Sequence, residues 1–250
     1  MTQFRPTRFE ILPPVIKNLL IINGLVFLAQ VTFRNSPYAL EPIFALHTWQ
    51  SELFQPWQFV THMFMHGDFG HLFFNMFALW MFGSILENVW GQKRFLTFYL
   101  ICGLGAALCH MITLYFEYQQ IINEYNAINS QVELYNFMSR YATESMAVTP
   151  ENGNMVLRRA LNGETVGASG AVYGCLVAFG FLFPNTYIYL YFFLPLKAKW
   201  FVIGYIAIEL FATFQNSAGD NVAHFAHLGG ALFGFLMVLF WNKKNRRTFY

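Results

Sequence analysis

Residues 164–174 read ETVGASGAVYG. A long polar segment, residues 117–165, ends in this stretch, and an apolar run begins at Gly167. Ser169 lies just inside that run, with small residues on both sides. Polar groups inside an apolar segment are costly, and they mark functional sites more often than chance would. The apolar runs around this serine predict the fold, and the other polar residues within such runs predict the candidate site.

The composition excludes an ordinary water-soluble surface. Of the 250 residues, 56% are hydrophobic and only 11% are charged, whereas soluble domains carry roughly a quarter charged residues. We therefore predict an integral membrane protein whose surface contacts the lipid bilayer. The net charge of +2 is too small to indicate a nucleic-acid partner. Cys102, Cys109 and Cys175 all lie in apolar runs, without the spacing of a metal or disulfide framework.

Several apolar runs are long enough for bilayer-spanning helices, which need roughly 20 residues, or fewer where neighbours shield them. The first run has no small-x-small cleavage site after it, so we expect a span rather than a signal peptide. We predict a single all-α polytopic domain, residues 1–250, built as a six-helix bundle. Its spans are residues 14–33, 72–89, 95–116, 167–183, 200–214 and 222–241.

Basic residues orient the bundle, because Lys and Arg concentrate in cytoplasmic loops. With both termini cytoplasmic, only four of the fifteen Lys and Arg lie outside: Arg34, Arg140, Arg158 and Arg159. We expect this topology. The short termini and the lack of a transit peptide fit a bacterial plasma membrane.

Two long segments then lie on the outer side. Residues 35–70 are rich in Trp, Phe and His, which fits a first loop lying in the membrane interface; the aromatic residues 187–193 fit the interface as well. Residues 117–165 form an extracytoplasmic insertion between the third and fourth spans. Apolar residues at helical spacing predict an amphipathic helix that prolongs the third span. They are Ile121, Ile122, Tyr125, Ile128, Val132, Tyr135 and Met138.

Polar residues from distant parts of the chain are expected at one depth. The second, fourth and sixth spans all run from outside to inside, so their N-terminal ends share a leaflet. His71 and Asn75 lie at the first of these ends, Ser169 at the second and His227 at the third. At ~1.5 Å rise per residue, all lie within about ten ångströms of their helix starts.

The faces of the helices support this convergence. Gly170 and Gly174 form a small-xxx-small pair, as do Gly230 and Gly234, and such pairs let membrane helices approach closely. Because His227 shares a face with the second pair, it points along the side best able to meet the serine-bearing helix.

This grouping has the components of nucleophilic catalysis. A serine needs a neighbouring base to become a good nucleophile, and His227 has a suitable pKa near neutrality. Attack on an amide creates an oxyanion, for which each donor contributes roughly 3 kcal/mol. Asn75, His71 and the N–H groups that open the fourth helix are candidate donors.

The orientation of His227 is less evident. Glu209 lies within the fifth span and Asp220 in the following loop, so neither acid is evidently placed to orient the ring. We therefore predict a Ser–His dyad rather than a triad. Tyr173, one turn after Ser169, is suited to stacking on the imidazole, with core packing as the alternative.

Four motifs, in order along the chain, match one family. Residues 71–75 (HLFFN) fit HxxxN, after His62 and His66; residues 83–91 (GSILENVWG) fit GxxxExxxG; residues 167–170 (GASG) fit GxSG; residues 226–234 (AHLGGALFG) fit AHxxGxxxG. Together they resemble the rhomboid intramembrane serine proteases. The resemblance covers nearly the whole chain apart from residues 117–165.

The resemblance implies a Ser169–His227 dyad that cleaves transmembrane helices, typically of single-span proteins, without cofactor or metal. It implies an oxyanion hole from His71, Asn75 and the Ser169 backbone, and a structural role for Glu87. The supporting residues are Tyr173, which packs on His227, His224 on the same face, and Gly167 and Gly170, which leave room for a substrate backbone.

Two departures from the family are expected to matter. Many members carry Trp-Arg in the first loop, but this chain has Trp57-Gln58, so contacts of that arginine are missing. The insertion at residues 117–165 is also much longer than the expected short connection.

Alternative interpretations remain for these residues. A membrane-helix serine often bonds back to a backbone carbonyl, and GxSG alone can be a packing motif. The chain can also be a non-proteolytic relative that binds unstable helices, although such relatives generally lose the serine or the histidine. A metal site is the third interpretation, with His62 and His66 as the best ligand pair, but no His-Glu-x-x-His is present.

Overall fold

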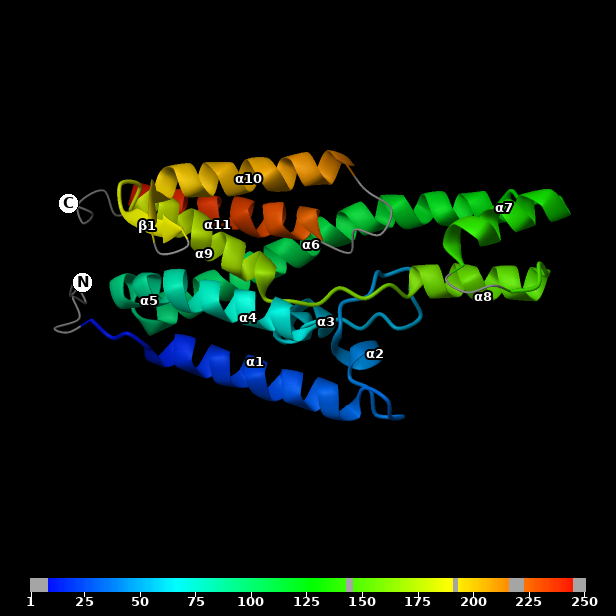
Figure 1. Ribbon diagram of the computed structural model, residues 1–250, viewed down its shortest axis with the longest axis horizontal. Coiled ribbons are helices and arrows are strands. Elements are labelled where there is room, and N and C mark those ends of the chain that lie inside the picture. Colours follow the sequence, from blue (N-terminus) through cyan, green and yellow to red (C-terminus); the bar gives the residue numbers. More distant parts are fainter. Residues whose placement is uncertain (1–8, 143–145, 191–192, 216–222, 245–250) are drawn as a thin grey trace.

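The computed structural model describes residues 9–142, 146–190, 193–215 and 223–244, and it is predominantly helical (Figure 1). Helices occupy all the segments expected to cross the membrane. They are α1 (Pro14–Phe33), the composite α4 (Phe69–Ala78), η2 (Leu79–Gly83) and α5 (Ser84–Trp90), α6 (Gln92–Asn126), α9 (Ser169–Leu182), α10 (Ala198–Gln215) and α11 (His224–Lys244).

Not all of these helices are equally suited to cross a bilayer. Among the described residues, four segments qualify by length and composition: Pro14–Phe33, Phe69–Trp90, Gln92–Asn126 and His224–Asn242. Helix α9 is apolar but has only 14 residues, fewer than the roughly 20 of an unshielded span. The six-span arrangement therefore stays a prediction.

The start of α1 and the end of α11 lie at the same end of the bundle. The Glu87 carboxylate, near the end of α5, accepts hydrogen bonds of 2.9 Å from the backbone N–H groups of Val15 and Ile16 at the start of α1. The guanidinium of Arg94, at the start of α6, lies 4.2 Å from the ring centroid of Trp241 in α11. Glu87 therefore ties helices together at the end remote from the starts of α4, α9 and α11.

Helices α6, α9 and α11 form a tightly packed centre. A Cβ atom on Gly230 would lie 1.9 Å from the carbonyl oxygen of Gly170, and one on Gly234 would lie 2.8 Å from the Cα of Gly174. These distances leave no room for a side chain, so the backbones of α9 and α11 touch, as small-xxx-small pairs allow.

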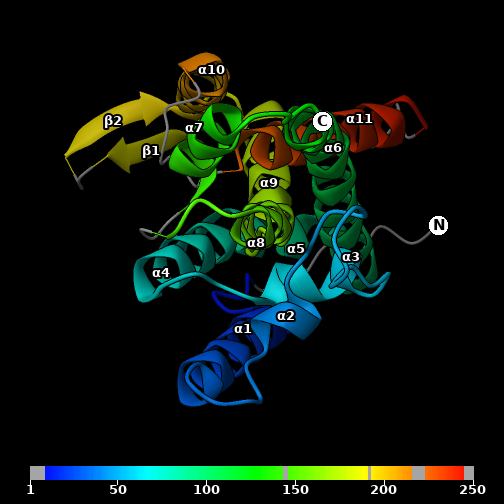
Figure 2. The ribbon, with the colours of Figure 1, turned by 90° about the vertical axis from the view of Figure 1, so that its right-hand side faces the viewer.

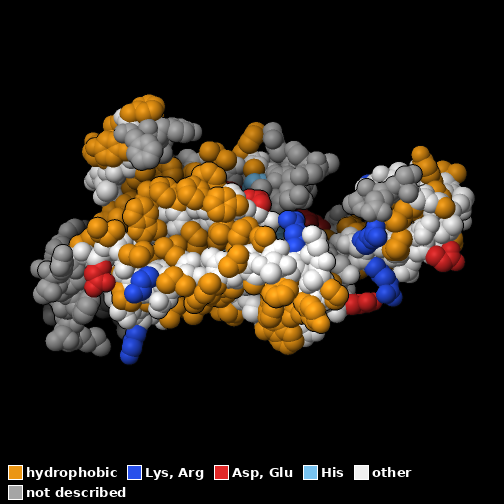
Figure 3. Space-filling view, turned by 60° about the horizontal axis from the view of Figure 1, so that its bottom comes forward, with side chains coloured by type: hydrophobic (Ala, Val, Ile, Leu, Met, Phe, Trp, Pro, Cys, Tyr) orange, Lys and Arg blue, Asp and Glu red, His pale blue; other side chains and the backbone are white. Residues whose placement is uncertain are grey.

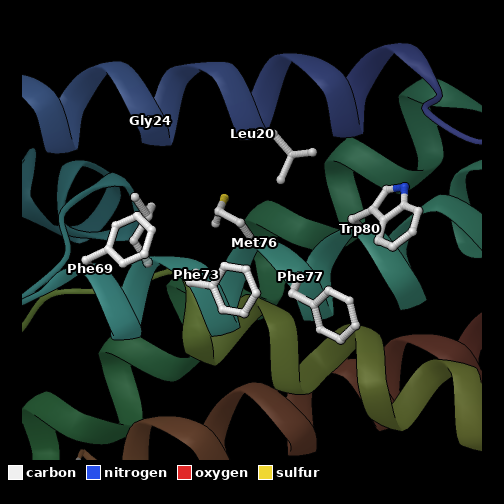
Figure 4. A pocket seen from close by; sticks show the side chains of 8 residues that line it. Leu20, Gly24, Phe69, Phe73, Met76, Phe77 and Trp80 are labelled. Carbon is white, nitrogen blue, oxygen red and sulfur yellow. The ribbon is translucent and has the colours of Figure 1, made fainter. Parts of the chain in front are cut away.

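The second span is not one regular helix. The side chain of Asp68 caps α4 by accepting a 2.9 Å hydrogen bond from the N–H of His71, and the π-helical η2 separates α4 from α5. Towards α1, this segment borders an apolar groove of about 370 Å³ (Figure 4). Its lining includes Leu20, Gly24, Phe73, Phe77 and Trp80, and none of the polar residues proposed for the active site.

The first loop contains short helices, and a buried glutamine bonds to four of its backbone groups. Its helices are α2 (Glu41–Phe44), α3 (Gln58–Thr61) and η1 (His62–Phe64). The Gln58 side-chain oxygen accepts from the N–H groups of His47 and Gln55, and its nitrogen donates to the carbonyls of Leu53 and Ile43. At the position where the resemblance led us to expect an arginine, a neutral amide thus bonds to four backbone groups of the loop.

The insertion projects beyond the bundle (Figures 1 and 2). Helix α6 continues outward to Asn126, as expected, but α7 (Gln131–Tyr141) and α8 (Pro150–Leu161) are separate helices. The amphipathic pattern is thus divided, because Ser130 caps a new helix by accepting from the N–H of Glu133. The insertion has its own small core, formed by Leu134, Phe137, Met138 and Val156.

One short segment of this predominantly helical fold is not helical. Strands β1 (Tyr187–Leu190) and β2 (Leu194–Lys197) form an antiparallel hairpin beside α10. The stretch between α9 and α10 is too short for another span, and strand pairing satisfies backbone groups that would otherwise lie unpaired near lipid. Tyr187 and Tyr189 are exposed on this hairpin, consistent with the expected interfacial position.

The outer surface of the bundle is apolar. Figure 3 shows hydrophobic side chains over the bundle, with Lys and Arg towards its ends and on the insertion. Leu25 and Leu28 of α1 and Ile208 and Phe211 of α10 are 61–65% exposed. Such side chains are stable in contact with lipid, so α1 and α10 present lipid-facing surfaces.

Candidate active site

Ser169 is the first residue of α9, and the segment before it is anchored to the first loop. Leu46 and Thr165 exchange two backbone hydrogen bonds of 2.9 Å, and the N–H of Gly167 donates to the carbonyl of His62 at 2.9 Å. Gly167 has φ +129°, a conformation that side-chain-bearing residues rarely adopt. These contacts hold Ser169 at the N-terminal end of α9.

Ser169 and His227 lie in direct contact. The distance from His227 Nε2 to Ser169 Oγ is 2.9 Å, and His227 is buried. One turn further along α11, Gly230 touches the backbone of Gly170, so helix packing sets the separation. A Cβ on Gly170 would also lie 2.3 Å from that of Ala106, so Gly170 packs directly against α6, and its role in leaving room for a substrate backbone stays a prediction.

Tyr173 stacks on the imidazole of His227. The ring centroids are 4.3 Å apart and the planes differ by 8°. This is the stacking expected from the spacing on α9. The Tyr173 hydroxyl also donates a hydrogen bond to Oε1 of Glu209 on α10, so the tyrosine contacts two groups of the site at once.

Glu209 lies against His227, where sequence reasoning had placed no acid. Its Oε1 is 3.1 Å from His227 Nδ1, and its Oε2 is 2.6 Å from His224 Nδ1. The first contact has ion-pair distance, but it does not have the geometry of a regular hydrogen bond. Glu209 is only 6% exposed, so its carboxylate depends on these neighbours for polar contact.

The two predicted oxyanion donors lie on α4, which packs against α9. His71 Nδ1 is 3.4 Å from the N–H of Gly67, an acceptor role that leaves the proton on Nε2. A Cβ on Gly167 would lie 2.8 Å from that Nε2, so the ring borders the loop before Ser169. Asn75 is buried, and within the described part of the chain its Nδ2 has no hydrogen-bond partner. Both nitrogens have protons to donate.

A family model for the rhomboid domain matches residues 53–122 and 126–244. The chain belongs to the rhomboid family. It is therefore a multi-pass integral membrane protein.

This rhomboid is similar to proteins from several kinds of organism. An uncharacterised mitochondrial rhomboid protein of Schizosaccharomyces pombe is 27% identical over 90% of this chain. The mitochondrial RHOMBOID-like protein 12 of Arabidopsis thaliana is 25% identical over 87%, and the rhomboid protease AarA of Providencia stuartii is 26% identical over 88%. The matches cover 64%, 55% and 69% of these relatives, so the chain spans about three-fifths of their length.

The comparisons change the expected location. Two of these relatives are named mitochondrial, and a further relative from Arabidopsis thaliana is named chloroplastic. The bacterial plasma membrane predicted from the short termini is therefore not supported. The two mitochondrial relatives are about as similar to this chain as the relative from Providencia stuartii.

Among the described residues, one group of side chains has the composition of a metal site. The ligand atoms of Glu209, His224 and His227 all lie within 4.8 Å of one another. His62 and His66, the pair expected from sequence, are not part of this group, and His62 Nδ1 lies 2.8 Å from the carbonyl oxygen of Gln58. At metal–ligand distances of ~2.0–2.1 Å, tetrahedral zinc ligands lie about 3.3 Å apart. The 2.6 Å contact between Glu209 and His224 is shorter and fits a hydrogen bond better.

Glu209 is the functional candidate that sequence reasoning missed. An ionisable residue within an apolar helix of a membrane protein signals a functional site by default, and Glu209 lies close to the C-terminal end of α10. That position is the depth expected for His227. His224, predicted to share a face with His227, reaches the same carboxylate. Asp220, the other acid considered, lies outside the described residues.

Proposed function

We propose that this rhomboid is an intramembrane serine endopeptidase that cleaves transmembrane-helix substrates. The observation that carries the proposal is the 2.9 Å contact between Ser169 Oγ and His227 Nε2. It lies within hydrogen-bond reach, as expected for a nucleophile and its general base. The relative from Providencia stuartii, named a rhomboid protease, supports the same activity.

The first step is attack by Ser169 on the scissile carbonyl. His227 Nε2 takes the hydroxyl proton as the new bond between Oγ and the carbonyl carbon forms. Nε2 must therefore begin unprotonated, with the proton of the neutral ring on Nδ1. Stacking on Tyr173 keeps the imidazole in one plane during this transfer.

The developing oxyanion needs preorganised donors. His71 Nε2, Asn75 Nδ2 and the backbone N–H groups at the start of α9 are the proposed donors. The unpartnered Nδ2 of Asn75 supports this role, because a buried donor without a partner is costly unless a ligand uses it. His227 then gives its proton to the leaving amine, and a water activated by the same ring hydrolyses the acyl-enzyme.

The proposed substrates are helices of single-span membrane proteins. Ser169 and His227 begin α9 and α11, so the site lies near one end of the bundle, which we assign to the outer leaflet. In this topology six helices cross the membrane, both termini are cytoplasmic, and the insertion of residues 117–165 is extracytoplasmic. The first loop lies beside the site through its pairing with Thr165.

Replacing the nucleophile tests the proposal. Ser169→Ala should lower cleavage of a single-span substrate in liposomes by at least about 10³-fold, because the covalent route is removed. The matched control is Ser84→Ala, which alters another buried helical serine remote from His227. Wild-type protein and the control should react at Ser169 with a fluorophosphonate probe, and Ser169→Ala should not.

Two results would contradict the assignment. Cleavage by purified Ser169→Ala at the wild-type rate would exclude the serine mechanism, and loss of cleavage on chelation would indicate a metalloprotease. A wild-type protein that binds helices but neither cleaves them nor reacts with the probe would be a non-proteolytic member.

A further inference from the structure

Glu209 differs from its neighbours on α10. Ile208, Leu210 and Phe211 are 64%, 45% and 65% exposed, whereas Glu209 is 6% exposed. An ionisable side chain in a membrane helix turns towards polar partners because lipid cannot solvate it. The partners of this carboxylate all belong to or adjoin the proposed catalytic pair.

We propose that Glu209 is a positioning residue for His227, so that the site works as a Ser169–His227–Glu209 triad rather than a dyad. This inference rests on the proposed protease function and adds a third group to it. The acid comes from α10, the base from α11 and the nucleophile from α9, helices that lie side by side in Figures 1 and 2.

The tautomer of His227 is the first argument. For Nε2 to accept the proton of Ser169, the ring must carry its own proton on Nδ1. Glu209 Oε1 lies 3.1 Å from that atom. A carboxylate there stabilises the Nδ1–H form before attack and the imidazolium that forms during attack. The alignment of this contact is imperfect, but catalytic hydrogen bonds often tighten only in the substrate complex, so the geometry is compatible with this role.

The support of the carboxylate is the second argument. The Tyr173 hydroxyl donates to Oε1, and His224 Nδ1 lies 2.6 Å from Oε2. Both oxygens are therefore held by side chains other than His227, and rotation of the carboxylate is restricted. Because Tyr173 also stacks on the imidazole, one side chain positions both the base and its acid.

The test compares catalysis with stability in purified protein. Glu209→Gln keeps the shape of the side chain and removes its charge. With a single-span substrate in liposomes, kcat should fall by about 10- to 100-fold while KM stays within about two-fold, since the interaction acts in the transition state. The rate constant of fluorophosphonate labelling at Ser169 should fall in parallel.

Glu87→Gln is the matched control. Glu87 is also a buried glutamate, but it binds the backbone of α1 and touches no part of the site. Its substitution should lower the melting temperature and leave kcat per labelled enzyme within about two-fold of wild type. If Glu209→Gln fails to fold, Glu209→Asp replaces it. Withdrawing the charge by one methylene should lower kcat at unchanged KM.

Three results would overturn the triad. The first is wild-type kcat in Glu209→Gln, or in Glu209→Asp where that variant is used. The second is a loss of activity in Glu209→Gln that is explained entirely by a smaller fraction of folded protein. The third is a metal ion in purified wild type, absent from Glu209→Gln, whose removal stops cleavage. Failure of the protease proposal looks different, because wild type would then remain unlabelled or Ser169→Ala would still cleave.

Discussion

The centre formed by α6, α9 and α11 and the outer helix α10 both contribute to the site, but they are built differently. In the centre, glycines bring backbones into contact, as where Gly230 meets Gly170. On α10, a Cβ at Gly204 would meet nothing within 4 Å, and most large side chains face outward. Nucleophile and base are thus fixed by rigid backbone packing, whereas the acid depends on a single side chain of a peripheral helix.

The largest expected effect comes from breaking the glycine contact. Gly230→Ala would place a Cβ 1.9 Å from the Gly170 carbonyl oxygen, and backbone cannot yield as a flexible side chain can. Overpacking usually costs about 1–3 kcal/mol and occasionally more, and here we expect the upper end, with loss of fluorophosphonate labelling at Ser169. Thermal unfolding and labelling measure this. A variant with wild-type melting temperature and labelling would show that α9 and α11 are not locked together.

An intermediate effect is expected where the two regions meet. Tyr173→Phe keeps the ring stacked on His227 and removes the hydroxyl that holds Glu209. We expect kcat to fall by about 3- to 10-fold and the free energy of unfolding to fall as well, since one hydrogen bond contributes roughly 1 kcal/mol. When Tyr173→Phe is made in the Glu209→Gln background, it should lower kcat by a smaller factor, because the effects of coupled residues are not additive. If the two losses of kcat are fully additive in a double-mutant cycle, Tyr173 does not act through Glu209.

The smallest effect is expected on α10 itself. Gly204→Ala adds a methyl group into open space and improves helix propensity. Stability should therefore stay constant or rise by less than about 1 kcal/mol, and cleavage should be unchanged. Thermal unfolding of Gly204→Ala and Gly230→Ala, measured side by side, compares the packing of α10 with that of the centre. A strongly destabilised Gly204→Ala would mean that α10 packs as closely as the centre.

The hydrophobic runs were sufficient to predict where the helices lie, but not where one helix ends and the next element begins. The break between α6 and α7 was predictable: Ser130 accepts from the N–H of Glu133, whose carboxylate accepts from the N–H of Asn129, close to the capping-box pattern. Apolar periodicity alone runs through this break. The hairpin at residues 187–197 was missed because a short aromatic stretch fits an interfacial segment and a strand equally well.

The departure at Gln58 shows a different limit. Sequence indicated only that an arginine was missing after Trp57. In the structure, the Gln58 amide bonds to four backbone groups around it. Which of those groups lie within reach depends on the path of the loop, and no local pattern determines that path.

The sequence by itself determined the membrane class, the helix positions and the pairing of Ser169 with His227, because chain polarity and glycine spacing bring the starts of α9 and α11 together. Only the tertiary structure decided that Glu209 faces His227. Helix α10 has no small-residue stripe to fix its rotation. The direction of its one carboxylate therefore depends on which neighbouring helices it packs against and on the polar partners they offer.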